Sequence, residues 1–284
     1  MTRIADLLAA GRTLSFELFP PKTDEAERQL EKCVVELAEL EPSFVSVTYG
    51  ALGSTRERTR DVVTRIEAEQ PFPAMPHLTC VGHTRADIAE LIDHYGARGV
   101  ENILALGGDP PADGSPVTGD YDHAVQLVEQ VRAHDAGFSV GVAAHPEVHP
   151  RSPDRESDRR HLVAKLELAD FAMTQFFFTV EVYERLVEEL AALGSHKPVI
   201  PGVMPIASVA GVRRMAAMNG TAIPDALQAR LDAADGQPEE VRKIGVEVAI
   251  ELSRALLSAG APGLHLYALN RSESVREVVA ALDR

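Results

Sequence analysis

The sequence has few cysteines and no long uninterrupted apolar segment. Cys33 and Cys80 are its only cysteines, and no CxxC pair occurs, so neither a disulfide framework nor a thiolate zinc site is expected. No run of roughly 18 apolar residues is present to span a bilayer. Charged Arg3, Asp6 and Arg12 interrupt the N-terminal segment, which argues against a signal peptide. We therefore expect a soluble, cytoplasmic protein that does not enter a membrane.

Basic residues are also in deficit. The chain has 28 Lys and Arg against 43 Asp and Glu, which gives a formal net charge of -15. A surface that binds duplex nucleic acid needs clustered cations to displace counterions from phosphates. We therefore expect the protein to bind small molecules and not nucleic acid.

Several common catalytic motifs are missing. The sequence contains no GxGxxG, Walker A, HExxH or GxSxG pattern. His145 and His149 are four residues apart, but Pro146 and Pro150 prevent the helix that would place both imidazoles on one face. We predict no metal site.

What the sequence does contain is a regular succession of short apolar segments. Eight of them are rich in β-branched and aromatic residues, which is typical of strands. The predicted strands are Leu14–Phe19, Phe44–Tyr49, Met75–Val81, Glu101–Leu106, Phe138–Ala144, Phe171–Phe178, Val199–Met204 and Leu264–Leu269.

Helical patterns lie between most of these strands. The clearest predicted helices are Asp24–Leu40, Arg85–Gly99, Tyr121–His134, Val180–Leu193 and Glu239–Ala259. Alternating strands and helices indicate a parallel sheet. Eight repeats in 284 residues predict a (βα)8 TIM barrel that forms a single domain over residues 1–284, preceded by a short helix at about residues 2–11.

Polar residues alternate with apolar ones in several strands, which favours a barrel over a doubly wound open sheet. In the first strand Ser15, Glu17 and Phe19 should point inward, and Ser46 and His77 should do so in the next two. Polar inward positions are best tolerated near the mouth, meaning the C-terminal strand ends and the loops that follow them. Glu17 must be ion-paired, hydrogen-bonded or protonated there, so it is either a structural ion-pair partner or a chemical group.

Two further residues stand near the predicted mouth. Asp109 follows Gly107-Gly108, where the lack of side chains lets a flat ligand approach, although Asp in such a loop also commonly caps its own turn. Gln175 offers a donor and an acceptor that could bind the edge of a heterocycle.

These segments together resemble the methylenetetrahydrofolate reductase family. The matching blocks follow one another in order from residue 14 to about residue 271. They are Ser15-Phe16-Glu17-Leu18-Phe19-Pro20-Pro21-Lys22, Val45-Ser46-Val47-Thr48-Tyr49-Gly50-Ala51, His77-Leu78-Thr79-Cys80, Leu104-Ala105-Leu106-Gly107-Gly108-Asp109-Pro110-Pro111, Pro146-Glu147-Val148-His149-Pro150, Thr174-Gln175-Phe176-Phe177-Phe178, Ile200-Pro201-Gly202-Val203-Met204-Pro205 and Leu269-Asn270-Arg271.

The resemblance implies an enzyme that uses NADH or NADPH, through FAD, to reduce 5,10-methylenetetrahydrofolate to 5-methyltetrahydrofolate. It implies that Glu17 is the general acid toward N10, that Asp109 contacts pterin and flavin, and that Gln175, Arg271 and Met215 contact the folate. It also implies a homo-oligomer. The flavin-contacting positions implied are Thr48, His77, Leu106, Gly107, Gly108, Asp109, Ala144, His145, His149, Asp158 and Lys165.

The chain departs from the family pattern mainly around the flavin. Gly107 replaces an Arg usual before Gly-Asp, His145 replaces Tyr or Phe, Leu52 replaces a small residue, and one residue is missing before Ala169. Met215 also stands roughly where an aromatic residue is frequent. Two alternatives therefore stay open, namely direct hydride transfer from NAD(P)H without flavin and a folate- or flavin-binding barrel without catalysis. A barrel lyase or aldolase is disfavoured because no Lys lies within the predicted strands.

Overall fold

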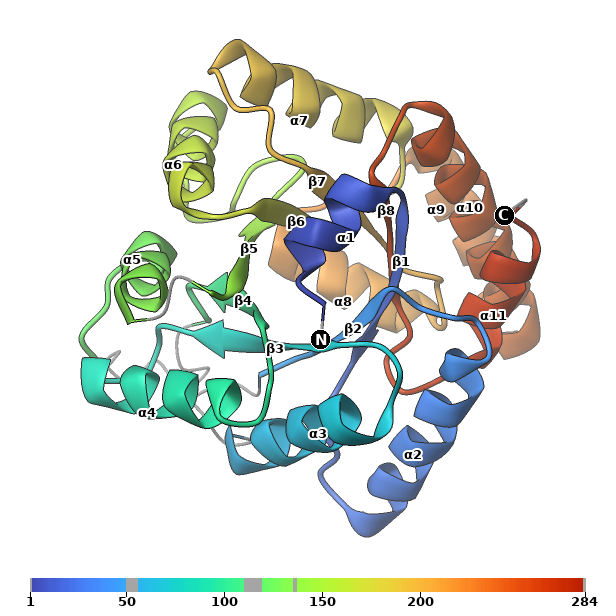
Figure 1. Ribbon diagram of the computed structural model, residues 1–284. Coiled ribbons are helices and arrows are strands. Elements are labelled where there is room, and N and C mark those ends of the chain that lie inside the picture. The colour runs from blue at the N-terminus through green and yellow to red at the C-terminus, as the bar shows by residue number, and fades with distance from the viewer. Residues whose placement is uncertain (1, 50–55, 110–118, 135–136, 283–284) are drawn as a thin grey trace.

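A computed structural model describes residues 2–49, 56–109, 119–134 and 137–282. Eight parallel strands form a closed barrel in which each strand pairs with its neighbours in sequence and β8 pairs with β1 (Figure 1). The TIM-barrel prediction is confirmed. The strands are β1 (Thr13–Leu18), β2 (Phe44–Val47), β3 (Ala74–Thr79), β4 (Asn102–Leu106), β5 (Ser139–Ala144), β6 (Phe171–Phe176), β7 (Val199–Val203) and β8 (Gly263–Tyr267).

Helices form a layer around the strands (Figure 1). Many begin at a side-chain cap, as where Thr23 Oγ1 accepts a hydrogen bond from the backbone N–H of Ala26. The helices are α1 (Ile4–Ala10), α2 (Asp24–Ala38), α3 (Arg56–Glu69), α4 (Arg85–Gly96), α5 (Ala124–His134), α6 (Arg155–Leu168), α7 (Val180–Ala192), α8 (Val209–Asn219), α9 (Asp225–Ala233), α10 (Pro238–Ser258) and α11 (Glu273–Ala280).

The strands alternate between two apolar environments. Phe16 and Val45 belong to the large cluster that packs against the helices, whereas Phe44 and Met75 belong to a smaller cluster inside the barrel. The parallel register pairs Glu17 with Ser46, so the polar positions of β1 and β2 share the interior. The predicted two-residue alternation is thus confirmed for these strands.

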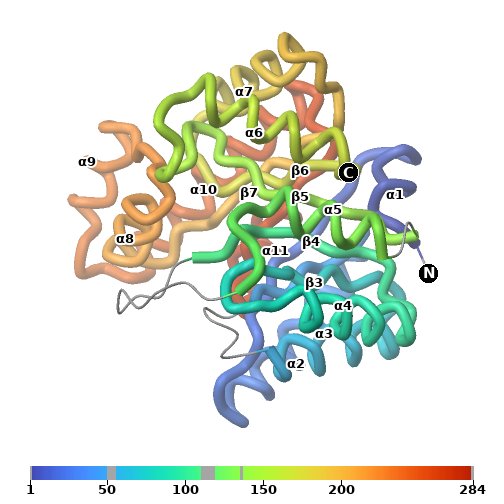
Figure 2. Tube along the Cα trace, turned by 90° about the vertical axis from the view of Figure 1, so that its left-hand side faces the viewer, coloured from blue at the N-terminus to red at the C-terminus, as the bar shows by residue number. Residues whose placement is uncertain are grey.

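Helix α1 closes one end of the barrel. Its Ile4 is fully buried in the interior cluster, and the backbone N–H of Ile4 donates to Asn102 Oδ1 on β4 at 2.7 Å. The N–H of Ala5 donates to Ser139 Oγ on β5 at 3.0 Å. Burying one such side chain stabilises the fold by about 1.5–3 kcal/mol. Figure 2 shows α1 at this end and α8 and α9 at the other, where the mouth lies.

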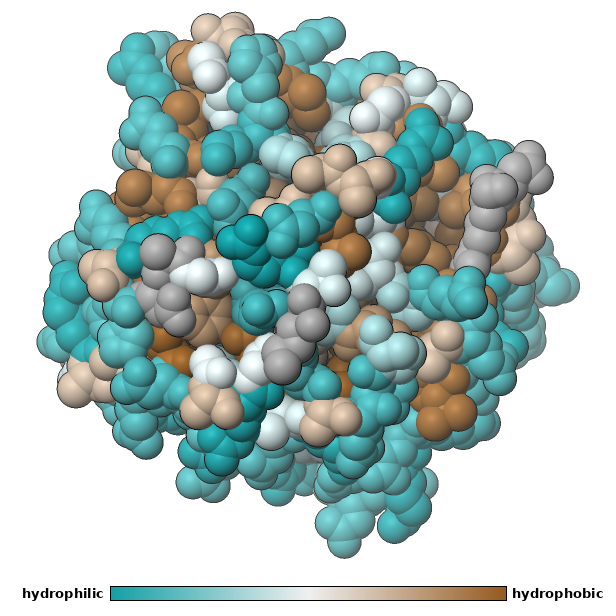
Figure 3. All heavy atoms as spheres, in the orientation of Figure 1, coloured by the Kyte–Doolittle hydropathy of each residue, from teal (hydrophilic) through white to brown (hydrophobic). Residues whose placement is uncertain are grey.

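The surface around α1 is largely polar (Figure 3). Figure 3 shows mostly hydrophilic side chains on the face around α1, with apolar ones in separate groups. Within the described ranges, no helix is long and apolar enough to cross a membrane.

Candidate active site

Glu17 lies inside the barrel near the C-terminal end of β1, and only 7% of it is exposed. Its Oε2 is 3.8 Å from Nε2 of His77 on β3 and 3.6 Å from Nε2 of His265 on β8. Two imidazoles from different strands therefore approach the same carboxylate oxygen. The sequence prediction that Glu17 and His77 share the mouth is confirmed.

His265 is a site residue that the sequence analysis did not identify. It is fully buried, with Nδ1 2.9 Å from Ser15 Oγ and Nε2 3.3 Å from Ser46 Oγ. Its ring stacks on Phe44, with ring centroids 6.2 Å apart. The signal was available, because a two-residue alternation in the last strand places His265 inward and its register pairs it with Ser15.

Tyr267 is the next inward residue of β8. Its hydroxyl donates to the carbonyl of Thr174 on β6 at 3.3 Å. Burial, and secondarily the charge of Glu17, raise the pKa of Tyr267 well above its usual value. Gly202 makes room for the ring, because a Cβ there would lie 2.9 Å from Tyr267 Cε2. Tyr267 therefore stays protonated and uncharged beside Glu17.

His77 is a neutral base at physiological pH. Burial lowers its pKa to about 4, the charge of Glu17 opposes this shift, and His265 adds to it. Its Nε2 is buried and has no hydrogen-bond partner among the described residues. A buried polar atom without a partner is costly, which indicates a ligand or water contact at this position.

A second group of predicted residues gathers where β5 leads into α6. Asp158 is buried and its Oδ1 accepts hydrogen bonds from the backbone N–H of His149 at 3.2 Å and from Ser152 Oγ at 3.1 Å. Lys165 Nζ donates to the carbonyl of Ala143 at 2.8 Å. The rings of His145 and His149 meet edge to face at 4.4 Å between centroids. The structure thus brings four predicted cofactor residues together.

Burial sets the charge of this group. It lowers the pKa of His145 to about 3, with His149 and Lys165 adding to the shift. It also lowers the pKa of Lys165 to about 8, against the opposing charge of Asp158. At neutral pH the group therefore combines a neutral His145 with a Lys165 that is mainly cationic.

Arg159 holds the backbone of this segment in place and was not predicted. Its guanidinium is almost fully buried and donates to the carbonyls of His145 at 3.1 Å, Pro146 at 2.7 Å and Glu147 at 2.9 Å. Its Nε donates to Glu189 on α7 at 2.7 Å. An arginine in a charged helical segment gives no sequence signal of such a role, because most are solvent-exposed.

At the end of β4 the backbone passes close to the side chains of Thr79 and Val81. Gly108 has a φ of +81°, and a Cβ there would lie 3.1 Å from Thr79 and 3.2 Å from Val81. Only glycine fits this position without strain. Leu106 packs against the interior cluster, and the following Asp109 is exposed. Burial lowers the pKa of His149, and the nearby charge of Asp109 opposes that shift, so the two lie on the same rim.

The remaining predicted residues lie around this rim. Thr48 follows β2, where its N–H donates to the carbonyl of Leu18 at 2.9 Å, and Ala144 is buried at the end of β5. Met215 packs on a cluster that includes Tyr267. Leu52 and the Pro110-Pro111 pair lie outside the described residues.

Gln175 has a fixed amide. Its Oε1 accepts a hydrogen bond from Asn219 Nδ2 at the end of α8, at 3.1 Å. This bond uses one of the two lone pairs of Oε1 and fixes the amide so that its NH2 is turned away from Asn219 as a donor. Asn219 was not predicted, because contacts between a strand and a helix three elements later have no local pattern.

The exit of β8 is strained. Leu269 and Asn270 have φ values of 51° and 60°, a region that side chains rarely adopt. Asn270 holds the turn by accepting from the N–H of Phe19 at 2.8 Å and donating to its carbonyl at 2.9 Å. Such strain is common at ligand sites. Arg271 follows with an exposed side chain, and the structure shows no contact between it and Glu17.

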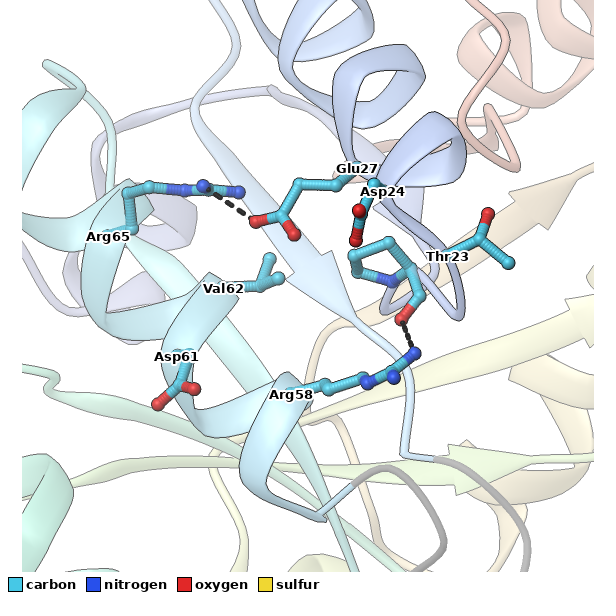
Figure 4. A pocket seen from close by; sticks show the side chains of 8 residues that line it. Thr23, Asp24, Glu27, Arg58, Asp61, Val62 and Arg65 are labelled. Atoms are coloured by element: carbon cyan, nitrogen blue, oxygen red, sulfur yellow. Dashed lines mark hydrogen bonds and ion pairs between the residues drawn. The ribbon is translucent and has the colours of Figure 1, made fainter.

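Two other possibilities are not supported. Among the described residues no group of three or more His, Cys, Asp or Glu could hold a metal ion. A cavity of about 230 Å³ lies between α2 and α3, away from Glu17, with Arg65 paired to Glu27 and Arg58 donating to the carbonyl of Pro21 (Figure 4). Its arginines are engaged and three carboxylates line it, so it does not suit an anionic ligand.

Comparisons with known proteins identify the family of this chain. The family model "Methylenetetrahydrofolate reductase" matches residues 3–283. The chain is 36% identical over 262 residues to the 5,10-methylenetetrahydrofolate reductase of Escherichia coli (strain K12), covering 92% of this chain and 87% of that protein. It is 33% identical over 287 residues to "Methylenetetrahydrofolate reductase (NADH) 1" of Zea mays, covering 96% of this chain and 48% of that protein.

A solved structure shares the fold. It is a Clostridium thermocellum protein described as binding two copies of 5-methyl-5,6,7,8-tetrahydrofolic acid, with a TM-score of 0.68 and 13% identity over 97% of this chain and 96% of that chain. At this identity the likeness concerns the barrel alone. The family model and the relatives carry the assignment, and the chain belongs to the methylenetetrahydrofolate reductase family.

Proposed function

We propose that this protein reduces 5,10-methylenetetrahydrofolate to 5-methyltetrahydrofolate with NADH or NADPH, using FAD as the hydride carrier and Glu17 as the general acid toward N10. The observation that carries the proposal is the position of Glu17, an almost buried carboxyl at the mouth with His77 and His265 beside it. The NADH in the name of the maize relative supports a nicotinamide reductant.

The chemistry requires an acid in this place. The five-membered ring of the substrate must open to an iminium before its carbon can accept hydride, and this opening needs a proton on N10. Glu17 is the inward-facing carboxyl at the end of β1, and Tyr267 beside it stays protonated. His265, held by Ser15 and Ser46, lies 3.6 Å from the carboxylate and would restrict where it can point.

The residues present suit a flavin dinucleotide. The unpartnered Nε2 of His77 offers a contact to a heterocycle, and Gly107-Gly108 carry no side chains that would keep a flat ring from the backbone. Lys165 supplies a cation for a diphosphate. When bound, FAD would accept a hydride from the nicotinamide and return it to the folate. The residues proposed to hold it are Thr48, His77, Leu106, Gly107, Gly108, Asp109, Ala144, His145, His149, Asp158 and Lys165.

The folate would bind on the other side of the mouth. Asn219 directs the amide NH2 of Gln175 outward as a donor, which suits an acceptor edge of the pterin. Met215 would pack on the substrate, and the exposed Arg271 would meet the carboxylates of the glutamate tail. Asp109 would contact the pterin from the β4 rim.

The direct test uses purified protein with added FAD, NADH and methylenetetrahydrofolate. We expect NADH oxidation that depends on the folate and yields 5-methyltetrahydrofolate. Absence of that product with both NADH and NADPH would refute the proposed reaction.

A flavin-independent reaction is the second candidate, favoured by the two altered rim positions Gly107 and His145. Turnover by protein whose absorption spectrum shows no flavin would support it, whereas strict dependence on added FAD would eliminate it. A third candidate is a barrel that binds folate or flavin without catalysis. Tight binding of either ligand with no turnover would support it.

A further inference from the structure

Gly107 lacks a side chain on the rim, and an arginine from another loop lies beside it. A Cβ built at Gly107 would meet Nη2 of Arg151 at 3.4 Å. The same Nη2 donates to the carbonyl of Gly108, also at 3.4 Å. The guanidinium therefore lies in van der Waals contact with the place where a side chain of residue 107 would start.

The backbone of Arg151 is fixed by residues already described in the site. Its N–H donates to Nδ1 of His149 at 3.0 Å. Asp158 accepts hydrogen bonds from His149, two residues before Arg151, and from Ser152, the residue after it. These hydrogen bonds hold the backbone of the loop between β5 and α6. The side chain of Arg151 extends from this loop to the residues that follow β4.

The guanidinium keeps most of its binding capacity. Its bond to Gly108 is long, so it is weak, and an arginine has five N–H donors. Within the described part of the chain, no carboxylate lies at ion-pair distance from Arg151, although acids outnumber bases by 15 in the sequence. Burial lowers the pKa of both His145 and His149, and the charge of Arg151 lowers them further. The guanidinium is therefore close enough to the mouth to act on charged groups there.

We propose that Arg151 is a cofactor-binding residue, whose guanidinium binds the diphosphate of a dinucleotide at the β4 rim in place of a side chain at position 107. This inference rests on the proposed function. A planar guanidinium with free donors suits a phosphate oxygen pair, and Lys165 supplies a second cation on the same side of the mouth. Both FAD and the nicotinamide nucleotide contain this diphosphate, so either could be the ligand.

The test is a set of equilibrium titrations of Arg151→Ala and Arg151→Lys with FAD, with NADH in the absence of flavin, and with riboflavin. We expect Arg151→Ala to raise the Kd of one dinucleotide about tenfold or more, and Arg151→Lys to raise it less. Riboflavin has no phosphate, so its binding should not change. A rise for FAD alone identifies the flavin diphosphate as the ligand, and a rise for NADH alone identifies that of the nicotinamide.

Two further variants sharpen the result. Arg98→Ala is the matched control, because Arg98 is also exposed, donates to one carbonyl at 3.2 Å and lies between α4 and β4 at the opposite end of the barrel. Gly107 does not have a positive φ, so Gly107→Arg combined with Arg151→Ala should recover much of the lost affinity.

Unchanged dinucleotide affinities in Arg151→Ala, in a protein that still reduces the folate, would overturn the role of Arg151 and leave the proposed function standing. If the wild type bound neither dinucleotide, the proposed function would fail, and the role of Arg151 with it. The wild-type titration separates these two outcomes.

Discussion

The carboxylate of Glu17 and the imidazole of His265 come from neighbouring strands, and Oε2 and Nε2 are 3.6 Å apart. The imidazole is held at both nitrogens, by Ser15 and by Ser46. It therefore has little freedom to move away from Glu17. A group in this position can set where the acid points.

We predict that His265→Ala lowers kcat for folate reduction about 10- to 100-fold, because the acid loses its fixed neighbour. Reduction of bound flavin by NADH should change little, and the pH profile of folate turnover should shift. Stopped-flow measurement of the two half-reactions across pH checks this. An equal loss in both half-reactions with an unchanged pH profile would indicate a purely structural role.

The amide of Gln175 gives a second prediction. Asn219→Ala removes the bond that fixes its orientation, so KM for the folate should rise severalfold while kcat changes less. The matched control is Met218→Ala on the same helix, because 64% of Met218 is exposed. Steady-state kinetics of both variants tests this, and equal KM values would contradict the assigned role of Gln175.

Stability should depend on pH through His77 and His145. Their folded pKa values of about 4 and about 3 lie below the usual 6.5, so the unfolded chain binds more protons as pH falls below 6.5. The free energy of unfolding should therefore decrease from about pH 6.5 toward pH 4, by about 1–3 kcal/mol per histidine. Urea unfolding at several pH values measures this. His77→Gln should flatten the slope, and an unchanged slope would contradict the buried neutral state of His77.

Most of the fold was predictable because its pattern is local. The strand predictions begin within one residue of the observed strands, since each predicted strand is rich in β-branched and aromatic residues. Four predicted strands run two residues too far, and the observed ends are Val47, Thr79, Phe176 and Tyr267. The end of a strand depends on its pairing with the neighbouring strands, which nothing in a single strand shows. The register irregularity between Met173 and Phe176 likewise depends on the pairing with β7.

The site was predictable only in part, for the same reason. Glu17 and His77 were found because each is a polar residue facing inward in its own strand. Asn219, Arg151 and Arg159 contact segments distant in sequence or backbone carbonyls. Such contacts leave no local pattern in the sequence. His265 could have been found by applying the alternation of β1 to β8.

The central claim is that Glu17 delivers the proton to N10, and Glu17→Gln tests it most directly. The amide keeps the size and hydrogen-bonding capacity of the side chain but cannot donate a proton as an acid. The measurement is pre-steady-state kinetics of the two half-reactions in this variant, with its thermal unfolding as the control for folding. The account predicts near-normal oxidation of NADH by bound flavin and folate reduction lowered by at least about 100-fold. Folate reduction within a few-fold of the wild type would contradict it.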